Sequence, residues 1–546
     1  MFRSSILFRG GLVTVSNILL HKVTNSLELN QKELEGSATQ GGNEALKKYC
    51  KQNPSAPRPW PLTSGNSGSP GVAGGFDTVA RYAASMAPKK SGLTNDEDTY
   101  RNQLDEEAQR VVSRFGEVPG QTIVRAEVAK WLNEQFATRY SQEDIIVTNG
   151  AKEALANVFS ALLKEGDEVI MRERNWCSYV PQINYLGGEA VALKGSGMCE
   201  TITVTDLEKY MENRDLDQQI ILIWSFVTNP DGVQISEKQF KDIAEFLAKY
   251  KKAVILHDSS YDHFYGIDLN VQQMLDEAGF DSQNYIHVWG SGKSATVDHF
   301  IRAGGIASKH PELINRITDK ISQFSTHVSG LSQACLYGAL KDPHRADHVK
   351  QYIEFCEEKL ALFHDKLNDV PYLTQTSCSG GYAYLKIADE AFKNIDHLKV
   401  SGFNRAETLF LRYTAIRGIG GSAFGPDDQN YIRLNLAELT MVELEQVANN
   451  IKKGFDLRQQ HVENNIDLKT IEQDLVKHNQ KLQGANKLID KDMAFEYFAA
   501  DKKHDLNQNQ LEEILARADG KEFSLSGRLL ENIFNPVIEA NQERTK

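Results

Sequence analysis

The stretch "DIIVTNGAKEALANVFSALLKEGDEVIMR" (residues 144–172) decides the fold class. It opens with a short apolar run rich in β-branched residues (144–149), continues with helical patterning (151–166) and closes with a second apolar run (168–172). Short, continuously apolar runs are typical of strands that are buried on both faces of a parallel sheet. We expect the helix between them to end at Gly166, since glycine is a natural helix stop.

The same alternation continues along the chain. Helical patterning recurs at residues 236–252. Further apolar runs occupy residues 189–193, 220–225, 253–258, 285–290 and 304–308. This order predicts an α/β fold with a mostly parallel sheet of seven strands between two layers of helices. Ligands in such folds bind beyond the carboxyl ends of the strands, so functional residues are expected there.

Composition narrows the class of protein. The chain has 546 residues, more than one ordinary domain, with 61 Lys and Arg against 74 Asp and Glu, which gives a net charge of −13. No block of like charge is long enough for an arm that binds nucleic acid, so no nucleic-acid partner is expected. No run approaches about 18 consecutive apolar residues, so no membrane-spanning helix is expected either.

Cysteine usage and the N-terminus bear on the compartment. The six cysteines are scattered, with no C-x-x-C pair and no histidine cluster at metal spacing, which predicts free thiols and no metal site. Residues 1–27 contain no Asp or Glu and three basic residues. That composition fits the basic terminus of a cytoplasmic protein, which we favour, and also a mitochondrial transit peptide, which would place the protein in the matrix.

Polar and aromatic side chains follow several predicted strands. These strand-end residues are Asn149-Gly150-Ala151-Lys152, Asn175-Trp176, Asn229-Pro230, Asp258 with Tyr261, and Lys293. A glycine before a helix lets backbone N–H groups contact a phosphate. An aromatic side chain can cover a ring, a carboxylate can keep a pyridinium nitrogen protonated, and an amine can form an imine. Together these residue types fit a pyridine aldehyde phosphate.

Lys293 has a second interpretation. Gly292-Lys293-Ser294 matches the end of the nucleotide-binding loop G-x-x-x-x-G-K-[ST]. That loop needs a glycine five positions before Gly292, where this chain has His287. The spacing excludes the nucleotide loop and leaves a covalent lysine.

The ordered set resembles the pyridoxal-phosphate-dependent aminotransferases of class I and II, which have the aspartate-aminotransferase-like fold (fold type I). The similarity runs from about residue 85 to 455. The motifs that carry it are "TNGAKEAL", "GDEVIM" with "RNWCSY", "TNPDGVQIS", "HDSSYDHFYG", "GSGKS" and "GSAFGPDDQNYIRLNLAEL". Each motif alone has an ordinary explanation, such as a helix N-cap for Asp258 or a turn for Asn229. Their joint order favours the family.

The resemblance implies a role for each strand-end residue. Lys293 would hold pyridoxal 5′-phosphate as a Schiff base, with Asp258 at the ring nitrogen and Tyr261 at the 3′-oxygen as the other catalytic residues. The remaining cofactor contacts would come from Gly150, Ala151, Lys152, Trp176, Asn229 and Arg302. The substrate would meet Arg433 at its α-carboxylate, together with Asn229 and Trp176.

Two positions depart from the family's pattern. Gly290 stands three residues before Lys293, where the family usually has serine or threonine at the phosphate, so Ser291 is expected to supply that hydroxyl. Arg302 follows Lys293 by nine residues, one more than is common in the family.

The resemblance also implies a domain plan. A large cofactor-binding domain would span residues 110–330, and a smaller α+β domain would combine residues 53–109 and 331–455. Residues 1–52 would form an N-terminal extension and residues 456–546 a helical C-terminal extension. Family members are usually homodimers, and the same is implied here.

The implied function is transfer of an amino group between an amino acid and a 2-oxo acid. A β-lyase, decarboxylase or cyclase would keep the cofactor on the same fold and change the reaction. A non-catalytic cofactor-binding protein is the third alternative, motivated by Gly290 and by the additional residue before Arg302.

Overall fold

The computed structural model describes residues 38–53, 59–63, 116–212, 219–266, 268–296 and 301–486. Most of the predicted segments 1–52 and 53–109, and the C-terminal extension beyond residue 486, lie outside these ranges. Within them, none of the helices combines the length and the hydropathy that a membrane crossing requires.

A seven-stranded sheet forms the centre of the larger part of the fold, as predicted. Its strands run in the spatial order β2-β8-β7-β6-β5-β3-β4. They are β2 (Ile145–Thr148), β3 (Glu168–Arg172), β4 (Glu189–Leu193), β5 (Ile220–Trp224), β6 (Ala253–Asp258), β7 (Tyr285–Gly290) and β8 (Gly304–Ser308). All neighbouring pairs are parallel except those of β8, which is antiparallel to both β7 and β2. Every residue of β5 and β6 is buried, which explains their continuously apolar sequences.

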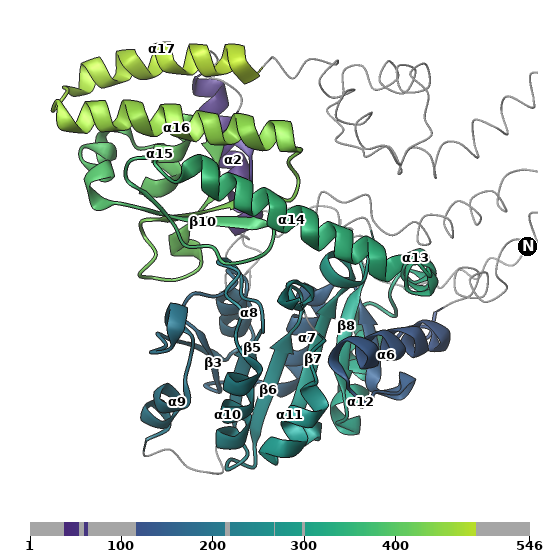
Figure 1. The fold of residues 1–546 in the computed structure, drawn as a ribbon. Helices are drawn as coiled ribbons and strands as arrows, with labels where there is room; N and C mark the ends of the chain where they lie inside the picture. The colour runs from purple at the N-terminus through teal and green to yellow at the C-terminus, as the bar shows by residue number, and fades with distance from the viewer. Residues whose placement is uncertain are drawn as a thin grey trace, which may run out of the picture. The chain divides into compact units, whose positions relative to one another are not determined.

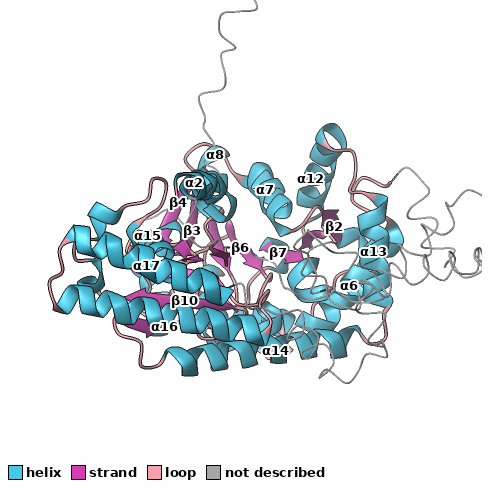
Figure 2. Ribbon diagram, turned by 90° about the horizontal axis from the view of Figure 1, so that it is seen from above, coloured by secondary structure: helices cyan, strands magenta, loops and turns pink. Residues whose placement is uncertain are grey.

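Helices cover both faces of this sheet (Figure 1). One face packs against α7 (Ala151–Leu162), α8 (Tyr179–Tyr185) and α12 (Pro311–Phe324). The opposite face packs against α6 (Thr122–Phe136), α9 (Val204–Met211), α10 (Glu237–Leu247), α11 (Val271–Ala278) and α13 (Gly330–Lys341). Figure 2 shows α7 and α12 on one side of the strands and α6 on the other. The predicted three-layer arrangement is therefore present.

The expected helix end at Gly166 is wrong by four residues. Helix α7 ends at Leu162, and Leu163 adopts an extended conformation after it. Gly166 lies in the following turn, where its φ of +82° is the left-handed conformation that glycine favours. The glycine therefore marks the turn into β3 and not the end of the helix.

A second, smaller region is built on an antiparallel sheet in the order β12-β13-β10-β9. Its strands are β9 (Leu373–Gln375), β10 (Tyr382–Ile387), β12 (Ile419–Gly420) and β13 (Tyr431–Asn435). Its helices are α14 (Arg345–Leu367), α15 (Arg405–Thr414), α16 (Met441–Glu463) and α17 (Leu468–Asn486). We call residues 116–341 the large-sheet region and residues 345–486 the small-sheet region.

Segments near the N-terminus also belong to the small-sheet region. Strand β1 (Trp60–Pro61) pairs in parallel with β11 (Ile416–Arg417). Helix α2 (Ala38–Gln52) places Tyr49 in a hydrophobic cluster with Phe403 and Leu411. Helix α2 and strand β1 therefore pack against this region, and α2 is not a free extension.

Two of the expected boundaries do not coincide with breaks in the structure. Helix α13 packs into the core of the large-sheet region, so the transition lies between residues 341 and 345 and not at 330. Helix α16 runs without interruption across residue 455, and α17 follows it closely (Figure 1). Ile471 and Leu475 of α17 share one hydrophobic cluster with Phe455 and Leu409, so residues 456–486 are part of the small-sheet core.

Replacing Leu475 with alanine tests this assignment. Leu475 is 1% exposed, and we expect its truncation to lower the free energy of unfolding by about 2–5 kcal/mol. The neighbouring Val476 is 54% exposed on the same helix, so Val476→Ala should change it by less than about 0.5 kcal/mol. Urea unfolding followed by circular dichroism measures both. Equal, small effects would mean that α17 does not contribute to the core.

Candidate active site

The sheet topology brings the predicted strand ends to one edge. Strands β5, β6 and β7 are parallel, and Gly304 at the start of β8 pairs with both Gly290 and Thr148. The carboxyl ends of β2 and β7 therefore lie at the edge where β6 ends with Asp258. A cavity of about 640 Å³ opens there. The predicted residues that line it are Gly150, Ala151, Lys152, Trp176, Asn229, Asp258, Tyr261, Lys293 and Arg302.

Lys293 lies in a single π-helical turn, Ser291–Ala295, that follows β7 directly. Its Nζ forms a short hydrogen bond with the Tyr261 hydroxyl and lies 3.9 Å from the centroid of that ring. Burial lowers the pKa of Lys293 from its usual 10.5 to about 7; Asp258 opposes this shift, while Arg433 and other nearby cations reinforce it. A large fraction of the amine is therefore unprotonated near neutral pH and able to act as a nucleophile.

Asp258 is 6% exposed, and its carboxylate is held from two sides. The Tyr179 hydroxyl donates to Oδ2 at 2.7 Å, and the N–H and Oγ of Ser260 donate to Oδ1 at 3.1 and 2.6 Å. Burial raises the pKa of Tyr179 well above its usual range, with the charge of Asp258 acting in the same direction, so the phenol keeps its proton. Tyr179 was missed by sequence reasoning. Its position one helical turn after Trp176 was the available signal.

A chain of polar contacts leads from Tyr261 into the small-sheet region. The amide of Asn229 donates to the Tyr261 hydroxyl at 3.4 Å, and the hydroxyls of Tyr261 and Tyr382 lie 2.8 Å apart. Tyr382 stands at the start of β10, in a segment with no recognisable motif, and sequence reasoning did not identify it. The contact joins Tyr261 to a strand 121 residues away in the chain.

Arg433 lies on β13 with 1% of its surface exposed. Its Nη1 donates to Oδ1 of Asn229 at 2.8 Å, and its guanidinium lies 4.3 Å from the centroid of the Tyr382 ring. No carboxylate pairs with Arg433 among the described residues, and its Nε finds no hydrogen-bond partner there. A buried cation without a paired anion is costly, so this position suits an anionic ligand.

The junction of β2 and α7 brings a second group of cations to the cavity. Gly150 has a φ of +95°, and a Cβ there would lie 3.2 Å from Nη2 of Arg302, so glycine lets the backbone approach the guanidinium. Lys152 lies with its Nζ 5.1 Å above the Trp176 ring. Burial and the charge of Arg302 lower the pKa of Lys152, while Cys177 opposes them. Two cations and a helix N-terminus therefore meet where a phosphate is expected.

Ser291 does not join this group, contrary to expectation. Its side chain is fully buried, and its hydroxyl donates to the carbonyl of Ala303 at 2.7 Å. The Ser260 hydroxyl lies 3.7 Å from where a Cβ on Gly290 would lie, and the Ser294 hydroxyl donates to the Gly290 carbonyl at 2.7 Å. The shift by one residue turns the Ser291 side chain into the core, away from the cavity.

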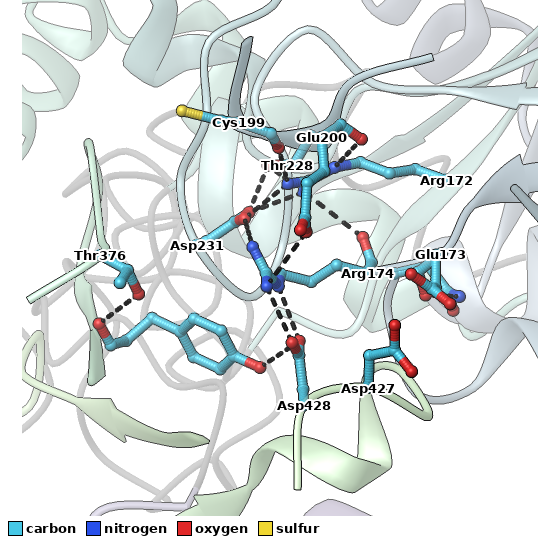
Figure 3. A network of polar contacts seen from close by, with 12 residues as sticks. Arg172, Glu173, Arg174, Cys199, Glu200, Thr228, Asp231, Thr376, Asp427 and Asp428 are labelled. Carbon is cyan, nitrogen blue, oxygen red and sulfur yellow. Dashed lines mark hydrogen bonds and ion pairs between the residues drawn. The ribbon is translucent and has the colours of Figure 1, made fainter. Parts of the chain in front are cut away.

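An ion-pair network borders the cavity and was also missed. Asp231 accepts from Nη1 and Nη2 of Arg172 at 2.9 and 2.7 Å, and Nη1 of Arg174 lies 3.3 Å away. Arg174 also holds Asp428 of the small-sheet region through Nε and Nη2, at 2.6 and 2.8 Å, and the Tyr384 hydroxyl donates to the same carboxylate. Figure 3 shows Arg174 between the two carboxylates. Burial alone would raise the pKa of Asp231, but Arg172 lowers it below its usual value.

These two arginines line the cavity, but their charges are balanced by Asp231 and Asp428. We call these four residues the interdomain clamp. The clamp connects the large-sheet and small-sheet regions beside the cavity. Among the residues that the structure describes, no group of three or more His, Cys, Asp or Glu side chains is arranged to bind a metal ion.

Comparison with known families agrees with this geometry. Residues 89–451, more than half of the chain, match the family model described as aminotransferase class I and II. The chain belongs to the class I and II aminotransferases. The predicted family is thereby confirmed, and with it the class of enzyme, a transferase of the pyridoxal-phosphate-dependent type.

Individual relatives of this class I/II aminotransferase are distant. A probable aspartate/prephenate aminotransferase of Rickettsia conorii is 24% identical over 347 residues, which cover 63% of this chain and 84% of the relative. An aspartate aminotransferase of Thermotoga maritima is 29% identical over 222 residues, which cover 40% and 55%. The structure of an aspartate aminotransferase from Thermus thermophilus with maleate superposes with a TM-score of 0.61 at 18% identity, covering 78% of this chain and 99% of that one. These similarities confirm the aspartate-aminotransferase-like fold.

Proposed function

We propose that this class I/II aminotransferase transfers an amino group between an amino acid and a 2-oxo acid, using pyridoxal phosphate attached to Lys293. The observation that carries the proposal is the enclosure of the Lys293 amine at the end of β7, against Tyr261 and in the same cavity as Asp258. An exposed loop lysine would have neither the lowered pKa nor these neighbours.

The residues present fit the cofactor. Its phosphate would be held by Arg302, Lys152 and the N-terminus of α7, where Gly150 lets the backbone come close to Arg302. Asp258 would face the ring nitrogen, and Trp176 would cover the ring. When bound, pyridoxal phosphate supplies an aldehyde that joins to the Lys293 amine and a protonated ring that draws electrons from the α-carbon of the substrate.

Lys293 would also move the proton. With its amine not bonded to the cofactor, Lys293 would accept the α-proton of the substrate and hold it for return. Tyr261 keeps its own proton, because burial raises its pKa well above the usual range and the neighbouring Tyr382 reinforces the effect. Its hydroxyl accepts from the Lys293 amine, and its proton would be available to the phenolic oxygen of the cofactor.

Arg433 would hold the substrate through its α-carboxylate. The guanidinium already bonds Asn229, which fixes its orientation, and its unpartnered Nε is a free donor among the described atoms. A two-pronged contact with a carboxylate orients the bond to be broken as well as binding the substrate. We also expect a homodimer, which is typical of this family.

The test is to purify the protein and follow its absorbance with a panel of amino acids. We expect a coloured protein, borohydride-reducible labelling of Lys293, and transfer of ¹⁵N from one amino acid to a 2-oxo acid. Release of ammonia with a keto acid, without an acceptor, would indicate a β-lyase, and release of carbon dioxide a decarboxylase. A coloured protein that turns over no amino acid would support a non-catalytic role.

The rate at which pyridoxal phosphate recombines with the apoprotein is expected to rise with pH. The neutral amine is the reactive form, and a pKa of about 7 makes its fraction increase about tenfold between pH 6 and pH 8. Stopped-flow absorbance measures the rate. A rate that keeps rising toward pH 10 would mean that Lys293 has the pKa of an ordinary exposed lysine.

Replacing Arg433 with glutamine is expected to lower kcat/KM for amino acids by about 10²–10³-fold, chiefly through KM, because a carboxylate would enter a buried site without its cation. Initial rates across a substrate series measure the effect. An amine that lacks the carboxylate serves as the control, since its already low rate should not fall further. An equal loss for both substrates would contradict a carboxylate contact.

A further inference from the structure

Two exposed cysteines lie close together where the large-sheet and small-sheet regions meet. Cys199 lies in the 3₁₀ segment Met198–Glu200 that follows β4, and Cys378 lies in the turn between β9 and β10. Both are free and exposed. The Cys378 thiol lies within hydrogen-bonding reach of the Cys199 side chain, although 179 positions separate the two residues in the chain.

The backbone of each cysteine is hydrogen-bonded to one of two paired residues of the interdomain clamp, Arg172 and Asp231. The carbonyl of Cys199 accepts from Nη2 of Arg172 at 2.6 Å, and that same nitrogen lies 2.7 Å from Asp231. The N–H of Cys378 donates to the carbonyl of Asp231 at 2.9 Å. A Cβ on Gly232 would lie only 2.0 Å from the carbonyl oxygen of Ser379. The turn that contains Asp231 is therefore in close contact with the turn that contains Cys378. The thiols are therefore held near one another by structure on both sides.

The backbone carbonyl and the sulfur of Cys199 point in different directions. Figure 3 shows its carbonyl directed to Arg172 while its sulfur points away from the arginines. The sulfur can therefore react without removing the hydrogen bond that the backbone makes to the clamp.

We propose that Cys199 and Cys378 are a redox-modification site, at which a low-molecular-weight disulfide oxidises the two thiols to a disulfide that joins the two regions. The Cys199 thiolate attacks one sulfur of the small disulfide, forming a mixed disulfide and releasing one small thiol. The Cys378 thiolate then attacks the sulfur of Cys199 and releases the second small thiol. Two protein thiols lose two electrons, the small disulfide gains them, and the two protons pass to the released thiols.

The groups around Cys378 make the second step dependent on pH. Burial raises the pKa of the Cys378 thiol to about 11; Cys199 and Asp231 add to the increase, and Arg172 opposes it. Cys378 is thus protonated at neutral pH, and each unit of rising pH up to about 10 makes about ten times more of its thiolate available. Closure of the disulfide should accelerate accordingly.

The disulfide would restrain the chain between residues 199 and 378 and fasten the large-sheet region to the small-sheet region. Closing so long a segment reduces the conformational freedom of the unfolded chain. The oxidised protein should therefore unfold at a temperature higher by roughly 2–10 °C than the reduced one.

The experiment incubates the full-length protein with mixtures of oxidised and reduced glutathione at pH 8, then measures intact mass and disulfide-linked tryptic peptides. We expect loss of two hydrogens, one linked peptide pair containing Cys199 and Cys378, two fewer titratable thiols and reversal by dithiothreitol. In Cys199→Ser the linked pair and the thermal shift should both be absent. Cys50→Ser, a substitution in α2 far along the chain, should leave both unchanged.

Three outcomes would overturn the proposal. The first is an intact mass that stays fully reduced in glutathione buffers that are as oxidising as the endoplasmic reticulum. The second is a persistent glutathione adduct at Cys199 that does not close at pH 9. The third is a disulfide between other cysteines, formed equally well in Cys199→Ser. Because peptide mapping reads the bond itself, each outcome is distinct from a failure of the aminotransferase reaction.

Discussion

Lys293→Ala is expected to lower the rate of amino-group transfer by roughly 10⁴-fold or more, because in the proposed mechanism one side chain both holds the cofactor and moves the substrate's α-proton. The amine is enclosed at the end of β7 with a pKa near 7, and the cavity's other amine, on Lys152, lies over Trp176 at the phosphate end. Among the described residues that line the cavity, no other group is therefore placed to take over both functions. Steady-state rates and the absorbance of the purified protein measure the loss.

Two further variants make this result specific. Lys293→Arg keeps a cation in the cavity but cannot form the covalent bond, so it should be as inactive as the alanine variant. Lys309→Ala removes a lysine that pairs with Asp144 outside the cavity, and it should retain activity. Borohydride treatment should label the native protein at Lys293 and leave both Lys293 variants unlabelled. Retention of activity in Lys293→Ala would refute the proposed function.

Asp258→Asn is expected to reduce kcat by about 10²–10³-fold, with a smaller change in KM. The substitution preserves the shape of the side chain but removes the charge that would keep the ring nitrogen protonated. Without that proton the ring draws electrons from the α-carbon less strongly, so the barrier to proton abstraction rises. Single-turnover kinetics with α-deuterated substrate should show a larger isotope effect than in the native protein.

Tyr179→Phe provides a graded comparison. It removes one hydrogen bond to the Asp258 carboxylate, 2.7 Å long, and leaves the charge in place. A hydrogen bond to a charged group contributes about 1.5–3 kcal/mol, so the loss in kcat should be about 10- to 150-fold and no greater than that of Asp258→Asn. A Tyr179 variant that is more damaging than the Asp258 variant would mean that Asp258 does not act through its charge.

The fold was largely predictable because its strands are buried on both faces. Continuous apolar runs such as residues 253–258 and 285–290 correspond to β6 and β7 with the same bounds. Parallel strands end at one edge of the sheet. Residues far apart in the chain, such as Gly150 and Asp258, therefore line one cavity. A local sequence pattern is sufficient to predict where such residues lie, because the sheet topology is regular.

What could not be predicted depends on contacts across the two regions. Tyr382 meets Tyr261, and Asp428 meets Arg174, through pairings of irregular segments that leave no periodic signal. The prediction for Ser291 was wrong for a different reason. A motif with one residue shifted does not reveal which side of a tight π-helical turn each side chain occupies, and here the shift directs the hydroxyl toward Ala303. The place of α17 was likewise decided by packing.

The position of α2 and α17 has a practical consequence for anyone who expresses this protein. Both helices lie outside residues 89–451, the span that matches the family, yet both contribute apolar side chains to the small-sheet region. A recombinant chain trimmed to the family span would leave bare the surfaces that Tyr49, Ile471 and Leu475 cover. Contiguous uncovered apolar surface promotes aggregation, so soluble yield should fall sharply when either helix is deleted.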